Sequence, residues 1–121
     1  MNKIYQFSRK NVGAVGSSGS LPEKLSTAAA CHDAGRLQQA ESLYREILAK
    51  HPTCAAARHR LGVLAFQAGQ VEAALKLIDS AAVLEPGNAV FHMSLGALLR
   101  SQNRLQEAEV ACRKSVELDP T

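Results

Sequence analysis

The sequence contains no tryptophan and few other aromatic residues, three phenylalanines and two tyrosines among 121 positions. Its three cysteines form no Cys-x2-Cys pair, so the spacing of a zinc site or a disulfide framework is missing. No run of 18 or more apolar residues occurs, and no apolar core of a secretory signal follows the first basic residues. These absences exclude membrane-spanning and disulfide-rich classes. They predict a cytoplasmic protein without a metal or cofactor.

Positive charge is concentrated at one end of the chain. The formal net charge is +3, and residues 1–20 hold Lys3, Arg9 and Lys10 but no acidic residue. Residues 21–121 carry 11 basic and 11 acidic residues and are neutral. A neutral region lacks the basic stripe that binding to a phosphate backbone requires. We therefore predict no nucleic-acid partner.

A period of 34 residues runs through most of the chain. Pro52, Pro86 and Pro120 are spaced by this step, and the pair Leu61-Gly62 returns as Leu95-Gly96. Turn and packing positions keep the same phase: Gly35, Gly69 and Asn103; Ala40, Ala74 and Ala108; Leu37, Val71 and Leu105. Self-similarity at this period indicates a repeat array, whose function lies in a surface rather than in a catalytic pocket.

Each repeat unit is predicted to contain two antiparallel helices. In the first unit, one helix begins at Leu21 and ends before Gly35, and the second helix ends before Pro52. Apolar residues on that second helix recur at spacings of three and four, which is the helical period. The sequence thus predicts an all-α fold of three tandem helix-turn-helix units, at about residues 21–54, 55–88 and 89–121.

Residues 1–20 are predicted to be a flexible leader because small residues and glycines dominate positions 11–20. An apolar cluster interrupts this leader from Ile4 to Phe7. The cluster has two interpretations, which the residues leave open. It is either a remnant without a role or a short docking segment for an apolar groove.

The repeat units resemble the tetratricopeptide repeat family. The second unit matches its signature at Leu61-Gly62, Ala74 and Pro86, and the third and first units keep the equivalent small residues and prolines. The resemblance covers about residues 21–121. It implies that the units stack as a right-handed superhelical solenoid, in which the first helix of each unit lines a concave groove. It also implies a non-catalytic scaffold for protein–protein interaction.

The resemblance assigns groove residues to the first helix of each unit. Positions where some family members carry Lys, Arg and Asn to grip a terminal carboxylate are mainly apolar here, so we expect no carboxylate clamp. An apolar groove with a basic edge suits an amphipathic helix or an apolar peptide. The predicted partner-binding residues are Leu25, Ala29, His32, His59, Arg60, Val63, Phe66, Gln67, Val90, Met93, Ala97 and Arg100.

Two alternative functions stay open. The amino-acid sequence of the units is similar to that of bacterial repeat regions that precede glycosyltransferase or sulfotransferase domains. In the first alternative, the chain is therefore the N-terminal part of a larger enzyme. The second alternative is a self-assembly module. In that case a second copy would be contacted through Leu105–Leu118, an apolar flank without a following helix, or through the cluster from Ile4 to Phe7. No nucleophile beside an oriented base is apparent, so no catalytic residue is predicted.

Overall fold

A computed structural model describes residue 7 and residues 19–120 of the chain. Six α-helices and no strand occur among these residues, which confirms the predicted all-α repeat solenoid. The helices are α1 (Leu21–Asp33), α2 (Leu37–Lys50), α3 (Ala55–Gln67), α4 (Val71–Leu84), α5 (Ala89–Ser101) and α6 (Leu105–Leu118).

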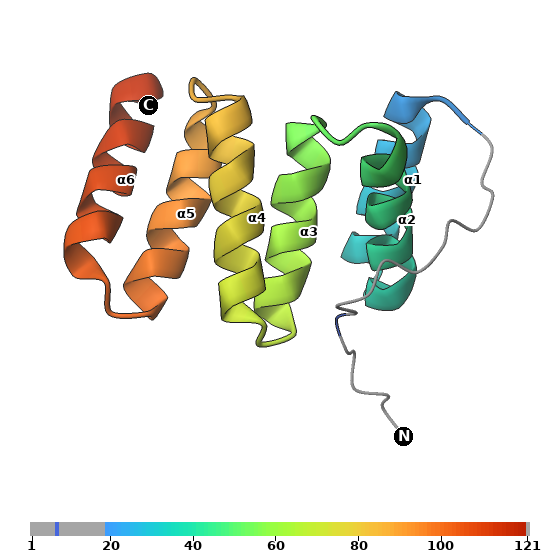
Figure 1. Cartoon of the computed structure of the whole chain (residues 1–121), viewed down its shortest axis with the longest axis horizontal. Helices are drawn as coiled ribbons and strands as arrows, with labels where there is room; N and C mark the ends of the chain where they lie inside the picture. The colour runs from blue at the N-terminus through green and yellow to red at the C-terminus, as the bar shows by residue number, and fades with distance from the viewer. Residues whose placement is uncertain (1–6, 8–18, 121) are drawn as a thin grey trace.

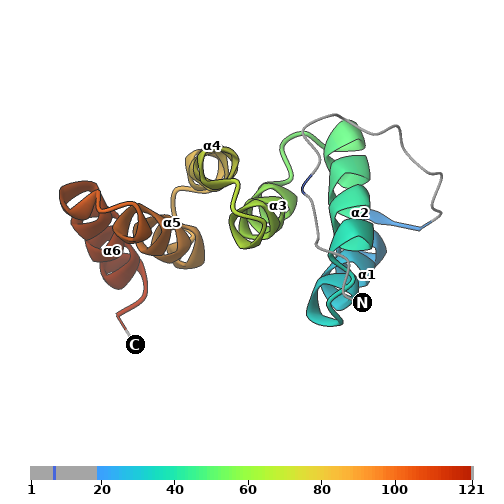
Figure 2. The same cartoon turned by 90° about the horizontal axis from the view of Figure 1, so that it is seen from below.

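The helices are stacked in chain order as three antiparallel pairs along the long axis of the molecule (Figure 1). Viewed from below, α4 is seen nearly along its axis whereas α2 is seen from the side (Figure 2). Successive pairs are therefore rotated relative to one another. The main contacts between pairs join α2 to α3 and α4 to α5, as expected for a repeat array.

The turn inside each pair has the same hydrogen-bonding pattern. Gly35 has a φ of 80°, and its amide donates to the His32 carbonyl at 3.0 Å, while the next amide donates to the Cys31 carbonyl at 2.8 Å. This pair of bonds defines the Schellman ending of a helix, which needs a residue with positive φ. Gly69 (φ 80°) and Asn103 (φ 60°) occupy the same position in the later units. The recurrence of glycine and asparagine at these sites thus has a conformational cause.

Small residues allow the two helices of a pair to approach closely. A Cβ added at Gly62 would lie 2.6 Å from Cγ1 of Ile78, and one added at Gly96 would lie 2.5 Å from Sγ of Cys112. The first unit has Ala28 at the equivalent position, and its side chain is completely buried. A small residue thus recurs at this buried position in all three units.

The turn between units also uses an equivalent contact twice. Nε of Arg58 donates to the Pro52 carbonyl at 2.8 Å, and Nε2 of His92 donates to the Pro86 carbonyl at 2.8 Å. Arg58 and His92 are separated by one period of 34 residues. Both side chains satisfy a proline carbonyl in the turn that follows a helix, which fixes the direction in which the next unit starts.

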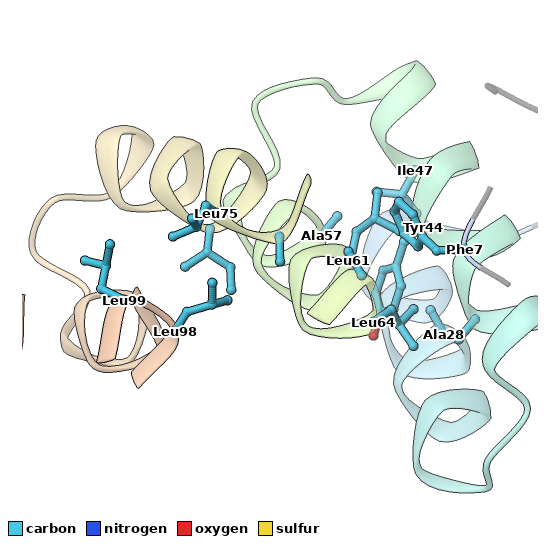
Figure 3. Close-up of a cluster of buried hydrophobic side chains, with 14 of the residues drawn as sticks. Phe7, Ala28, Tyr44, Ile47, Ala57, Leu61, Leu64, Leu75, Leu98 and Leu99 are labelled. Atoms are coloured by element: carbon cyan, nitrogen blue, oxygen red, sulfur yellow. The ribbon is translucent and has the colours of Figure 1, made fainter. Parts of the chain in front are cut away.

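The main hydrophobic core continues across all three units. Figure 3 shows Tyr44, Leu61 and Leu64 gathered where the first two units meet, with Phe7 beside them. Leu98 and Leu99 belong to the same cluster farther along the array (Figure 3). Burial between units, rather than one central core, therefore holds the fold together.

The predicted leader of residues 1–20 lies outside the described residues except for Phe7, Gly19 and Ser20. The Ser20 hydroxyl accepts a hydrogen bond from the Glu23 amide at 3.4 Å and caps the start of α1. The division into a leader and three units at the stated limits stays a prediction.

We expect Gly62→Ala to destabilise the array because the new methyl group would overlap Ile78. Overpacking of this kind costs about 1–3 kcal/mol, which exceeds the gain of about 1 kcal/mol in helix propensity. Thermal unfolding followed by circular dichroism should show a lower midpoint. The matched control is Gly87→Ala, since a Cβ there meets no atom within 4 Å. An unchanged midpoint for Gly62→Ala would contradict the close approach of α3 and α4.

Candidate functional site

The predicted partner-binding residues lie on α1, α3 and α5, and we call the surface they form the first-helix face. The most exposed large apolar side chains on it are Phe66 (42%), Val90 (50%) and Met93 (55%). On α5 the exposed residues Val90, Met93, Ala97 and Arg100 follow at spacings of three and four and form one stripe. Arg60 and Gln67 are exposed on α3, whereas Leu25, Ala29 and Val63 are half-buried.

Two hydrogen bonds connect neighbouring first helices across the array. Nε2 of His32 on α1 lies 2.8 Å from Oε1 of Gln67 on α3, and Nε2 of His59 on α3 lies 2.7 Å from Oγ of Ser94 on α5. These bonds show that α1, α3 and α5 adjoin along one side of the solenoid. The three helices can therefore present their exposed residues to a single ligand.

His59 differs from the sequence prediction, which placed it at the edge of the groove. Its side chain is 9% exposed, and its ring lies against Phe91 with centroids 4.9 Å apart. Burial, with a smaller contribution from the neighbouring Arg60 charge, lowers the pKa of His59. His59 thus supports the face from beneath. The 34-residue pattern gave no signal for this contact, because the equivalent positions in the other units hold different residue types.

Electrostatically, the exposed part of the first-helix face combines apolar side chains with two guanidinium groups, those of Arg60 and Arg100. Nη2 of Arg100 lies 3.6 Å from Sγ of Cys112, which directs this side chain toward the second helix of its pair. An apolar surface with a basic edge fits a ligand that has an apolar stripe and adjacent acidic residues.

A second concave site was not predicted from the sequence. A cavity of about 740 Å³ lies between α4 and α6, and its floor includes Leu95 and Leu99 of α5. Because these residues are on the opposite side of α5 from Val90 and Met93, the cavity faces away from the first-helix face. We call it the outer groove. Its lining residues are Glu72, Leu75, Lys76, Asp79, His92, Leu95, Leu99, Arg104, Glu107, Val110, Ala111 and Lys114.

Charges of both signs rim the outer groove. The Arg104 guanidinium donates to the Glu107 carboxylate at 2.7 Å, and this hydrogen bond lowers the pKa of Glu107. Val110 is 66% exposed in the wall that α6 provides. Exposed apolar surface between charged residues is typical of an interaction site rather than of a hydrolytic centre.

No group of three or more His, Cys, Asp or Glu side chains in residues 7 and 19–120 could hold a metal ion. None of the six helices has the length and apolar character needed to cross a bilayer.

Comparison with known proteins identifies the repeats. A family model described as Tetratricopeptide repeat matches residues 32–98, and a second model with the same description matches residues 93–118. Cellulose synthase operon protein C of Pseudomonas fluorescens (strain SBW25) is 32% identical over 93 residues, which cover 70% of this chain and 7% of that protein. The inactive TPR repeat-containing thioredoxin TTL3 of Arabidopsis thaliana is 36% identical over 62 residues, or 51% of this chain and 9% of that protein.

Solved structures share the same stacking of helices. The Yersinia enterocolitica type III secretion chaperone SycD, in complex with a peptide of the translocator YopD, is 21% identical with a TM-score of 0.77 and covers 85% of this chain and 79% of that chain. The O-GlcNAc transferase of Thermobaculum terrenum is 27% identical with a TM-score of 0.79, and the match covers 83% of this chain and 19% of that chain.

We expect the stability of the protein to fall in mild acid because of His59. The lowered pKa means that the unfolded chain takes up a proton near the ordinary histidine value, about 6.5, while the folded chain stays neutral until a lower pH. The free energy of unfolding should therefore decrease between about pH 7 and about pH 5. Urea denaturation across this range should show a shallower decrease for His59→Gln, which keeps a polar side chain near Ser94.

The matched control is His51→Gln, because His51 is exposed. His59→Gln should flatten the pH dependence more than this substitution does. Equal slopes for His59→Gln and the unmodified protein would contradict the role of the buried imidazole.

Proposed function

Because this chain belongs to the tetratricopeptide repeat family, we propose that it is a non-catalytic scaffold that binds a peptide or an amphipathic helix on its first-helix face. Tetratricopeptide repeats are in general non-catalytic modules of protein–protein interaction. The proposal includes the cytoplasmic location predicted from the sequence. The partner is a protein segment with an apolar stripe.

The observation that carries this proposal is the row of exposed apolar side chains on adjoining first helices. Phe66 on α3 and the stripe from Val90 to Ala97 on α5 remain in solvent, although the helices around them are well packed. Apolar groups at helical spacing are the anchors used when a helix lies in a groove. The hydrogen bond between His59 and Ser94 supports this arrangement because it ties α3 to α5.

Two comparisons support a protein partner. The similar chaperone SycD was solved with a bound peptide, and another similar structure is the CopN-Scc3 complex. The match to SycD covers 79% of that chain, so the shared part includes most of its helical array. These likenesses concern the fold, and the choice of partner by this chain rests on its own exposed residues.

A role within a larger protein is the second candidate. The chain spans 9% and 7% of the lengths of the two curated relatives, and 19% of the O-GlcNAc transferase chain. In this alternative the first-helix face would bind a substrate protein or a regulatory segment for an attached enzyme domain. Reading the coding sequence beyond the codon of Thr121 distinguishes the two candidates.

The double substitution Phe66→Asp and Met93→Asp should abolish partner binding, because two carboxylates would replace the apolar anchors. Affinity purification with quantitative mass spectrometry should show a specific interactor reduced by about tenfold or more. The matched control is Val83→Asp, a substitution on α4 at a side chain that is 71% exposed.

Circular dichroism checks that all three proteins retain the same helical content. An interactor that is retained equally by the double variant and by the control would refute binding on the first-helix face. An interactor lost with both proteins would have the same consequence, since the effect would not belong to this face.

A further inference from the structure

Phe7 from the N-terminal leader is buried where the first and second units meet. Its side chain is 9% exposed, and the Arg45 guanidinium lies over its ring, 4.6 Å from the centroid. The Glu41 carboxylate accepts a hydrogen bond from Arg45 at 2.8 Å and holds the guanidinium in place. Phe7 lines a hollow of about 430 Å³ with side chains of α2 and α4, among them Ala73 and Leu77.

The outer groove is the same site one repeat later. Adding 34 to the residues around Phe7 gives residues that line the outer groove in every case but one. The pairs are Arg45 and Asp79, Gln70 and Arg104, Ala73 and Glu107, Lys76 and Val110, and Leu77 and Ala111. The exception is Glu72, whose equivalent is Gln106; Glu72 itself lines both hollows. No described residue takes the place of Phe7 in the outer groove, and the cavity there is larger, about 740 Å³.

The floor of the outer groove carries leucines. Leu75 and Leu99 line it, whereas the residues one repeat earlier, Glu41 and Ala65, do not line the first hollow. Burial of an aromatic ring between these leucines and Val110 would remove apolar surface from water on both partners. The outer groove therefore offers apolar contacts to a phenylalanine ring, with Asp79 in the place of the Arg45 guanidinium.

The charge next to the ring position is reversed between the two sites. Asp79 replaces Arg45, and Glu72 lies on the same wall of α4. In the leader sequence, Arg9 and Lys10 follow Phe7 at short spacing. A phenylalanine with basic residues after it thus complements these two carboxylates, between which Lys76 also lies on α4.

We propose that the outer groove binds the Phe7-containing leader of a second copy of this chain. The contact joins unlike surfaces, so copies add head to tail, and two copies that exchange leaders close a swapped dimer. A leader that binds a neighbouring copy must first leave the hollow on its own chain. The contact within one chain is favoured because an attached segment has an effective concentration that is typically in the millimolar range. Association is therefore weak and increases with protein concentration.

A synthetic peptide of residues 1–12, carrying a fluorophore at its C-terminus, provides the probe. Titration of this peptide with the full-length protein should raise fluorescence anisotropy in a saturable manner. Val110→Asp should weaken binding by about tenfold or more, because it places a charge in the groove wall. The control Val116→Asp changes an equally apolar residue of α6 that is 61% exposed outside the cavity and should leave affinity within about twofold.

A peptide with Phe7→Ala should also lose about tenfold in affinity. Sedimentation of the unmodified protein should show association that grows with concentration and is reduced by Val110→Asp. Equal binding to the Val110→Asp and Val116→Asp proteins would overturn the proposal, as would a protein that stays monomeric throughout. In a full-length Phe7→Ala protein the first hollow is free to take the peptide. If the peptide bound this protein more tightly and Val110→Asp had no effect, the peptide would occupy the first hollow, and the proposal would be overturned too.

This experiment is independent of the test of the first-helix face. Phe66→Asp and Met93→Asp alter the other side of the array and should not affect binding of the leader peptide. Failure of one proposal therefore leaves the other intact.

Discussion

The architecture depends on the contact between a small residue on the first helix of each unit and a larger residue on the second. Gly62 against Ile78 and Gly96 against Cys112 leave no room for a Cβ, and the first unit has the fully buried Ala28 at the equivalent position. Close approach of the two helices lets the remaining side chains of each pair point either toward a neighbouring unit or into solvent. Both candidate binding surfaces consist of these remaining side chains, which do not take part in the contact within a pair.

Much of the fold could be predicted because its determinants are local and repeated. Gly35 and Gly69 mark the turns through a backbone conformation that few other residues adopt, and the prolines mark the start of each following unit. Agreement between units reinforced each assignment, which a single helix pair would not have allowed. The exposed residues of α5 were also within reach, because helical spacing alone places Val90 and Met93 on one side.

The rest depended on which side chains meet between units, and the period alone does not show this. The burial of His59 follows from Phe91 and Ser94 of the next unit, and neither contact recurs elsewhere in the array. The outer groove combines residues of three helices, and its resemblance to the Phe7 hollow becomes visible only when the lining residues are known. The sequence indicated that the cluster from Ile4 to Phe7 was unusual but not where Phe7 would lie.

The position of Phe7 also bears on how a short array stays folded. In a solenoid each interface between units contributes a large part of the total stability, and three units offer only two such interfaces. Phe7 contacts Arg45 of the first unit and lines a hollow with Leu77 of the second, so the leader braces the first interface. The second interface has no such brace among the described residues. A ligand in the outer groove would connect α4 to α6 and stabilise that interface through its own binding energy. Occupation of the outer groove would then also reduce fraying of α5, the helix that carries the exposed stripe of the first-helix face.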